Sequence, residues 1–202
     1  MDKKKLVIFG LSGDPVTISH LRIIFELSKK FDKVVVVPNL CDYYRKSPFM
    51  FTFEYRAELL HDAIEKLHKD NIDLCIVEKL LPKKHTYIDT LKKIQKAYGK
   101  SWDYYTAIGA DSYNNLTTWR KWKEIVKKTK FVAFLRKGTD LIPNDAIPYE
   151  LMNLAEFLDY RDDGSATRYR NDLNTMIMDH LFYSDASFYS AKVQSGEIDL
   201  DK

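Results

Sequence analysis

The segment from Gly10 to His20 carries residues suited to binding phosphate, and it reads Gly-Leu-Ser-Gly-Asp-Pro-Val-Thr-Ile-Ser-His. An apolar run precedes it and a helical pattern follows it, so its backbone amides should lie at a helix N-terminus, where anions bind. Thr17 and His20 are three residues apart and therefore share a face of that helix. Their hydroxyl and imidazole groups could donate to phosphate oxygens. The alternative is a threonine N-cap followed by a polar histidine.

A second segment with similar chemistry lies late in the chain, from Gly164 to Arg170, and reads Gly-Ser-Ala-Thr-Arg-Tyr-Arg. Ser165 suits the N-cap of a helix, with Thr167 in its first turn. Together with the Arg170 guanidinium, these residues would gather hydroxyl, amide and charged donors for phosphate oxygens. The alternative is a well-capped helix with an Arg–Asp surface pair, because acidic residues surround the segment.

Alternating strand and helix patterns should position these residues. Apolar runs or period-2 patterns predict strands, and apolar residues at helical spacing predict helices. The predicted strands are 6–9, 34–37, 72–76, 104–108 and 131–135, with a further candidate at 155–160. The predicted helices are 18–31, 59–67, 88–98, 119–126 and 169–177, and Gly99 should end the third of them.

This alternation predicts an α/β fold, a doubly wound parallel sheet with helices on both faces, in a single domain over residues 1–202. Such sheets bind ligands at the carboxyl ends of their strands, where the strand order reverses. The loops after Phe9, Val37, Ile108 and Leu135 are therefore the places to look for chemistry. The long loop from Pro38 to Thr52 is a further candidate for a functional segment.

Composition narrows the class of protein. Hydrophobic residues make up 45% of the 202 residues, which is typical of a globular chain, and no apolar run is long enough to span a membrane. The apolar stretch after Lys5 is too short for a signal peptide. Cys41 and Cys75 form neither a metal-binding pattern nor a disulfide framework, so we expect a cytoplasmic protein.

The charges are unevenly distributed. The net charge is +3, yet residues 140–202 hold 13 acidic and 5 basic side chains, and residues 1–139 hold 27 basic and 16 acidic ones. A basic front portion could attract phosphates, either on a small ligand or on a nucleic acid. The alternative is a lysine-rich solvated surface, because the lysines are scattered among acidic residues.

The Gly10–His20 segment resembles the glycine-rich and (His/Thr)-x-Gly-His signature of the nucleotidyltransferase superfamily. The Gly164–Arg170 segment resembles the Ile-Ser-Ser-Thr-x-x-Arg signature of the same enzymes. The resemblance implies that Gly10, Leu11 and Ser12 hold ATP phosphates, that His20 stabilises charge on the α-phosphate, and that Ser165, Thr167 and Arg170 bind the triphosphate. Three departures stand out: Gly13 replaces an aromatic residue, Thr17 replaces the histidine of the mononucleotide adenylyltransferases, and Ser19 replaces a glycine.

A third segment favours one subfamily. Gly109 and Asp111, with Trp119 eight residues after the aspartate, resemble the Gly-x-Asp…Trp arrangement of the nicotinate- and nicotinamide-mononucleotide adenylyltransferases. The resemblance implies that Gly109 and Asp111 lie beside the adenosine ribose and that Trp119 stacks on the pyridine ring. An indole suits an electron-poor ring, and a carboxylate suits a ribose diol. The alternative is that Trp119 belongs to the core with Trp122, on the same helix face.

Weaker matches complete the expected acceptor site. The resemblance implies that Lys46, near Pro38-Asn39, Arg45 and Arg56, reaches phosphate from the loop after the second strand. Tyr87 and Thr90 match an aromatic-x-x-Thr pair near the pyridine, and Arg136 with Gly138 matches an Arg-Pro-Gly. Each of these residues is equally compatible with an ordinary loop or surface position.

The expected activity is therefore adenylyl transfer from ATP to nicotinate or nicotinamide mononucleotide, in NAD biosynthesis, with His20, Thr17 and Arg170 as the catalytic residues. Mg²⁺ would be carried on the ATP phosphates, and no metal is expected on protein ligands, because the remaining histidines lack ligand spacing. The expected partners are ATP and the mononucleotide, without nucleic acid or membrane. The alternatives are another superfamily transferase, such as pantetheine-phosphate adenylyltransferase, and a non-catalytic nucleotide-binding protein.

Overall fold

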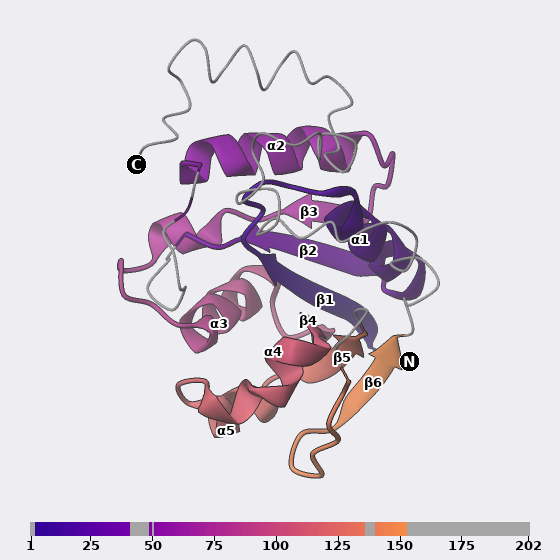
Figure 1. Cartoon of the computed structure of the whole chain (residues 1–202), viewed down its shortest axis with the longest axis vertical. Coiled ribbons are helices and arrows are strands. Elements are labelled where there is room, and N and C mark those ends of the chain that lie inside the picture. The colour runs from indigo at the N-terminus through magenta and orange to yellow at the C-terminus, as the bar shows by residue number, and fades with distance from the viewer. Residues whose placement is uncertain (1–2, 41–48, 50, 136–139, 153–202) are drawn as a thin grey trace.

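A parallel sheet of six strands in the order β3-β2-β1-β4-β5-β6 forms the centre of the molecule in the computed structural model (Figure 1). The structure describes residues 3–40, 49, 51–135 and 140–152. The strands are β1 (Lys4–Leu11), β2 (Lys33–Pro38), β3 (Ile72–Leu74), β4 (Trp102–Gly109), β5 (Lys130–Phe134) and β6 (Tyr149–Met152). Because β1 lies between β2 and β4, the chain order reverses there.

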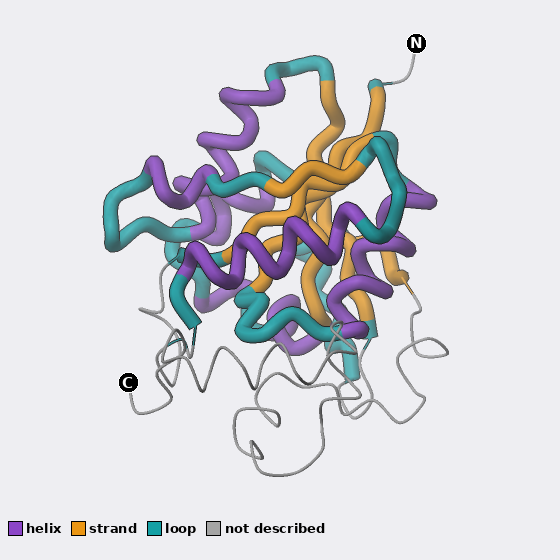
Figure 2. Tube along the Cα trace, turned by 90° about the horizontal axis from the view of Figure 1, so that it is seen from above, coloured by secondary structure: helices purple, strands orange, loops and turns teal. Residues whose placement is uncertain are grey.

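Helices cover both faces of this sheet (Figures 1 and 2). Helices α1 (Ile18–Lys30) and α2 (Phe53–Glu65) pack on one face, and α3 (Tyr87–Tyr98), α4 (Ala110–Asn114) and α5 (Trp122–Val126) pack on the other. Alternate residues of each strand point to opposite faces. In β1, Val7 and Phe9 join the core under α1 and α2, whereas Leu6 and Ile8 join the core under α3 to α5. The predicted doubly wound fold is confirmed.

Two element predictions were wrong. The third strand ends at Leu74 rather than Ile76, because a 3₁₀ turn, η1 (Val77–Leu80), follows and leaves Ile76 48% exposed. A single helix from Trp119 to Val126 does not form. Trp119 is extended after the 3₁₀ turn η2 (Leu116–Thr118), and α5 starts only at Trp122, after Lys121 in the left-handed region with φ 59°.

Four short elements were not predicted, namely η1, α4, η2 and β6. The sequence of β6 is Tyr-Glu-Leu-Met, and Glu150 and Leu151 are exposed because the strand lies at an edge of the sheet. The predicted strand at 155–160 and the predicted helix at 169–177 lie outside the described residues.

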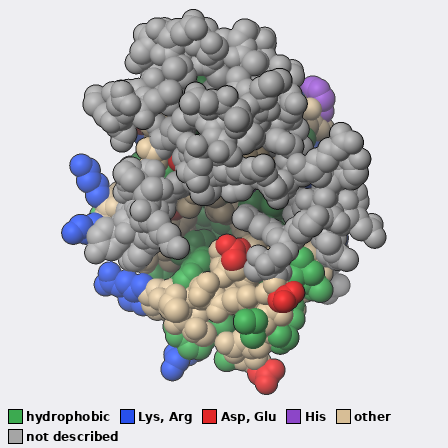
Figure 3. Space-filling model, viewed as in Figure 1, with side chains coloured by type: hydrophobic (Ala, Val, Ile, Leu, Met, Phe, Trp, Pro, Cys, Tyr) green, Lys and Arg blue, Asp and Glu red, His purple; other side chains and the backbone are tan. Residues whose placement is uncertain are grey.

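The described surface is mixed in charge. In the view of Figure 3, lysine and arginine side chains project along one side, and a few acidic side chains are scattered on the lower part. None of the helices in the described residues is both long and apolar enough to cross a membrane.

Candidate active site

The candidate site lies where β1 and β4 end side by side. These strands are parallel, and Phe9 pairs with Ala107. The chain therefore leaves both strands at the same edge of the sheet, with Gly10, Leu11 and Ser12 on one side and Gly109 on the other. Such a reversal point is where open α/β sheets bind ligands. The sequence correctly placed the first and third motifs together at this edge.

Thr17 and His20 meet at the N-terminus of α1. Thr17 is the N-cap of the helix, and its backbone N–H donates to His20 Nδ1 at 3.1 Å. The Thr17 hydroxyl also lies 3.0 Å from Nδ1. Because Nδ1 accepts the backbone hydrogen, we assign the hydrogen of the neutral imidazole to Nε2. The two residues share a face of the helix, as predicted, but Thr17 is only 2% exposed and its hydroxyl faces the histidine. Thr17 therefore positions His20.

The loop between β1 and α1 packs tightly on α2. Gly13 is buried and has φ +56°, a left-handed conformation that residues other than glycine rarely adopt. A Cβ atom at this position would lie 3.2 Å from Leu60 Cδ1 of α2. The backbone conformation therefore favours glycine at this departure from the family pattern, and the packing on Leu60 leaves little room for a side chain. The Asp14–Pro15 peptide bond in the same loop is cis.

Gly109 and Asp111 stand at the end of β4. Gly109 is buried and is the N-cap of α4, and Asp111 is exposed in the first turn of that helix. An exposed carboxylate at the end of a central strand can accept hydrogen bonds from a diol. Asp111 lies just after the end of β4, as predicted, and its role at the ribose stays a prediction. The short helix that presents it was not predicted.

Tyr87 and Trp119 form an aromatic pair beside this edge. Their ring centroids are 5.4 Å apart with an interplanar angle of 68°, an edge-to-face arrangement. Both rings are partly buried against the core under α3 to α5. The Tyr87 hydroxyl lies 2.6 Å from the Thr106 hydroxyl, and burial raises its pKa. Tyr87 therefore presents its ring, and its hydroxyl is engaged inside the protein.

The N-terminus of α3 is closed by a capping box. Asp89 accepts hydrogen bonds from the Thr86 N–H at 2.9 Å and from the Thr86 hydroxyl at 3.0 Å. Burial alone would raise the pKa of Asp89, but the bonds from Thr86 and the charges of Lys121 and Lys92 hold this pKa below its usual value. The capping box fixes the start of α3, where Tyr87 begins the helix.

Thr90 belongs to a buried polar cluster. It is 1% exposed, and its hydroxyl donates to Glu78 Oε1 at 3.0 Å. Glu78 Oε2 also accepts from the Leu40 N–H at 2.7 Å and lies 3.0 Å from His85 Nε2. His85 Nδ1 is 2.8 Å from the Pro82 carbonyl oxygen. The sequence did not indicate which way Thr90 points, and the structure turns its hydroxyl to Glu78.

Sequence reasoning missed several of the buried polar residues behind the site. Glu78 and His85 belong to no recognisable motif. They are seven residues apart in the sequence, and the chain brings them into contact through the turn η1. Arg56 was grouped with residues that reach phosphate, but it is 1% exposed and bonds to backbone carbonyls. A charged residue inside an otherwise apolar helix face, as Arg56 is in α2, was the one available signal.

Five predicted site residues lie outside the described part of the chain, namely Lys46, Arg136, Ser165, Thr167 and Arg170. In the described ranges, no group of three His, Cys, Asp or Glu side chains is arranged to hold a metal ion. The prediction that Mg²⁺ arrives on the ATP phosphates requires no such group, and it stays a prediction.

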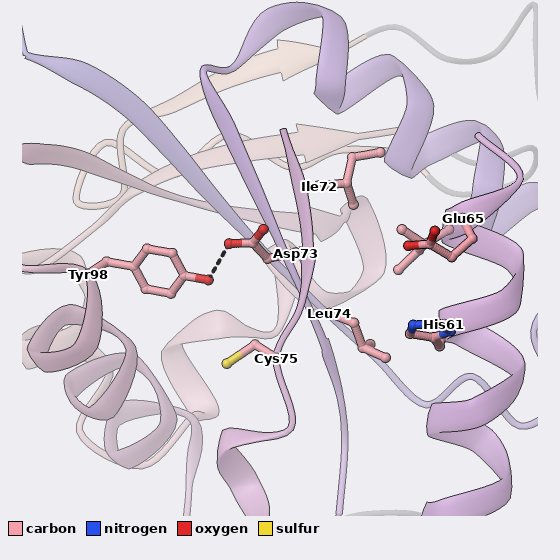
Figure 4. A pocket seen from close by; sticks show the side chains of 8 residues that line it. His61, Glu65, Ile72, Asp73, Leu74, Cys75 and Tyr98 are labelled. Carbon is pink, nitrogen blue, oxygen red and sulfur yellow. Dashed lines mark hydrogen bonds between the residues drawn. The ribbon is translucent and has the colours of Figure 1, made fainter. Parts of the chain in front are cut away.

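A hollow of about 390 Å³ lies along the edge strand β3 (Figure 4). His61 and Glu65 of α2 line it, together with Asp73, Cys75 and Tyr98. The Tyr98 hydroxyl donates to Asp73 at 2.8 Å. Tyr98 ends α3, whereas the candidate site lies near the start of that helix. The hollow is therefore separate from the candidate site.

Comparisons with known proteins agree with the geometry. The model of the cytidylyltransferase-like family matches residues 8–184. A relative from Fusobacterium nucleatum is 32% identical over 91% of this chain and 83% of its own length, and one from Aliarcobacter butzleri is 33% identical over 66% and 72%. Both are named "Probable nicotinate-nucleotide adenylyltransferase".

A solved structure has the same fold. It is Plasmodium falciparum nicotinic acid mononucleotide adenylyltransferase complexed with NaAD, with a TM-score of 0.74. The match covers 98% of this chain and 100% of that one, at 17% identity. At that identity the comparison establishes the fold alone.

Proposed function

The chain belongs to the cytidylyltransferase-like family, and from this premise we propose that it transfers the adenylyl group of ATP to nicotinate mononucleotide. The products are the dinucleotide and pyrophosphate, as in the activity for which its relatives are named. The single observation that carries the proposal is the orientation of His20. Its ring is held in the first turn of α1 with Nδ1 occupied by the Thr17 N–H, so that Nε2 bears the hydrogen.

In this mechanism the 5′-phosphate of the mononucleotide attacks the α-phosphorus of ATP in line, and pyrophosphate leaves. No covalent intermediate is needed, so the rate comes from positioning and from stabilisation of charge. His20 Nε2 donates to an oxygen of the transferring phosphate. Amides of the loop that follows β1 and of the start of α1 add further donors. Mg²⁺ bound to ATP supplies positive charge on the phosphates.

Asp111 and the aromatic pair of Tyr87 and Trp119 orient the two substrates. The Asp111 carboxylate is exposed at the end of β4, where it can accept hydrogen bonds from the adenosine ribose. Trp119, in edge-to-face contact with Tyr87, offers a ring face to the pyridine. Since the Tyr87 and Thr90 hydroxyls are engaged inside the protein, they do not select between the acid and amide acceptors.

Residues outside the described ranges complete the proposal on the strength of the family resemblance. Arg170, Ser165 and Thr167 bind the triphosphate, and Lys46 and Arg136 contribute positive charge on the acceptor side. We place the protein in the cytoplasm because Cys41 and Cys75 form no disulfide framework.

Pyrophosphate release with purified protein, ATP, Mg²⁺ and a panel of acceptors tests the proposal. Nicotinate mononucleotide, nicotinamide mononucleotide and phosphopantetheine are compared at equal concentrations. Release that depends on nicotinate mononucleotide supports the proposal. Release with phosphopantetheine alone, or with no acceptor in the panel, contradicts it.

A further inference from the structure

Arg56 is a buried cation directly behind the candidate phosphate loop. It lies in the first half of α2 and is 1% exposed. Arginine is seldom fully buried, because removing its charge from water is costly unless its donors are satisfied. The contacts that Arg56 makes at this cost therefore indicate what the residue is for.

The Arg56 guanidinium bonds to backbone carbonyls of three segments that meet at the carboxyl edge of the sheet. One terminal nitrogen, Nη1, donates to the Ser12 carbonyl in the loop after β1. The other, Nη2, donates to the Asn39 carbonyl at the exit of β2, at 2.8 Å. Nε donates to the Phe51 carbonyl, just before α2, at 3.2 Å. The ring of Phe49 lies 3.8 Å from the guanidinium carbon.

Two further hydrogen bonds hold the candidate phosphate loop against the same neighbouring segments. The Asn39 N–H donates to the Leu11 carbonyl at 2.9 Å, and the Phe51 N–H donates to Asp14 Oδ1 at 3.0 Å. The loops after β1 and β2 are thus tied together on both sides of Arg56. A planar fork with fixed donor directions suits such a junction, whereas the single ammonium of lysine cannot reach three carbonyls from one position.

The bond to Ser12 also sets the orientation of one amide of the loop. In a trans peptide the carbonyl and the following N–H point in opposite directions. When the Ser12 carbonyl points at Arg56, the Gly13 N–H points away from it. Gly13 cannot readily turn in compensation, because its φ of +56° and its packing on Leu60 restrict it.

We propose that Arg56 is a positioning residue for ATP binding, a clamp that fixes the loop after β1 so that its amides face the nucleotide phosphates. The inference rests on the proposed function for the identity of the nucleotide. Arg56 acts through the backbone of Ser12 and does not itself touch the substrate. Its contribution is geometric. A positive charge without the planar guanidinium group should therefore not be enough to position the loop.

The test compares Arg56→Lys and Arg56→Met with the wild type in the full chain. ATP binding is measured by calorimetry without any acceptor, and KM and kcat are measured with nicotinate mononucleotide. Both variants should weaken ATP binding about 10- to 100-fold, as expected when two to three hydrogen bonds lose their alignment. KM for the mononucleotide should stay within about threefold of the wild-type value, because the variants disturb only the ATP-binding part of the site.

Ile94→Ala is the matched control for lost stability. Ile94 is fully buried in α3, away from the start of that helix, and its truncation costs about 2–5 kcal/mol. This variant should be less stable but should bind ATP normally at a temperature where it is folded. Hydrogen exchange should increase across residues 10–17 in the two Arg56 variants and should not in Ile94→Ala.

Arg56→Ala with added guanidinium provides an independent readout. Guanidinium at tens of millimolar should recover part of the ATP affinity, and equal concentrations of ammonium should recover none. The proposal is overturned if Arg56→Lys binds ATP like the wild type, or if Ile94→Ala weakens ATP binding as much as the Arg56 variants do. If the wild type binds ATP but transfers nothing, the proposed activity fails while the clamp remains testable by calorimetry.

Discussion

Substitution of His20 separates catalysis from helix capping, because the two ring nitrogens differ in role: the structure shows capping at Nδ1, and the proposed mechanism uses Nε2. Nδ1 accepts the Thr17 N–H and closes the N-terminus of α1. Nε2 carries the hydrogen that stabilises charge on the transferring phosphate in the proposed mechanism. His20→Ala removes both functions. His20→Glu restores an acceptor at the third helical position, where glutamate completes a capping box, but it brings no donor for phosphate.

The expected magnitudes follow from these contacts. Loss of the capping interaction in His20→Ala should lower the free energy of unfolding by about 1 kcal/mol. Loss of one preorganised donor should lower kcat by about 10²–10³, equivalent to about 3–4 kcal/mol of transition-state stabilisation. His20→Glu should unfold like the wild type or later, since the first turn of α1 contains no acidic residue and a negative charge there is favourable. Its kcat should fall at least as far as that of His20→Ala.

Urea unfolding and steady-state pyrophosphate release, measured on the same preparations, check this prediction. ATP affinity should change less than kcat in His20→Ala. The reasoning is refuted if His20→Ala retains kcat within about threefold of the wild type, because one lost donor is expected to cost far more. It is also refuted if His20→Glu recovers activity along with stability, since the loss in His20→Ala would then reflect helix capping alone.

The other predictions concern the acceptor, the triphosphate and the start of α3. Trp119→Ala should raise KM for the mononucleotide by an amount equivalent to about 1–3 kcal/mol and leave KM for ATP nearly unchanged, with partial recovery in Trp119→Phe; a loss of ATP affinity instead would assign Trp119 to the core. Arg170→Lys should lower kcat/KM for ATP with folding intact, because it loses the planar fork, and an unchanged kcat/KM would remove Arg170 from the triphosphate site. Asp89→Asn should lower the free energy of unfolding by about 1 kcal/mol at pH 7, measured by urea unfolding across a pH series. Because the folded-state pKa of Asp89 is lowered, this difference should persist down to the usual value of 3.8 and shrink as the pH falls further; a difference that grows at acid pH would contradict the assignment.

The sequence predicted the sheet and the first loop well because both depend on local pattern. The runs at 6–9 and 34–37 are apolar on both faces, which only a covered parallel strand requires, and both strands formed where expected. Thr17 and His20 lie three residues apart on one helix, so their contact follows from helical geometry. Asp111 was placed correctly because it directly follows a strand.

The remaining features depend on contacts between distant residues. Thr90 has the spacing of a site residue, but its hydroxyl is taken by Glu78, twelve residues earlier, across a 3₁₀ turn that has no periodic signal. Trp119 was assigned to a helix because Trp122 and Ile125 follow at helical spacing. The left-handed Lys121 interrupts that helix, and nothing in the identity of a lysine indicates this conformation. The role of Arg56 is set by three backbone carbonyls, which carry no side-chain signature.

Tracing labelled phosphate from ATP to product tests the central claim most directly. The wild-type protein is incubated with Mg²⁺, nicotinate mononucleotide and ATP labelled at either the α- or the γ-phosphate, and the products are separated chromatographically. Adenylyl transfer predicts that the α-label appears in the dinucleotide and the γ-label in pyrophosphate, in equal amounts and only when the mononucleotide is present. Transfer of the γ-label to the mononucleotide, or no transfer of the α-label, would contradict the account.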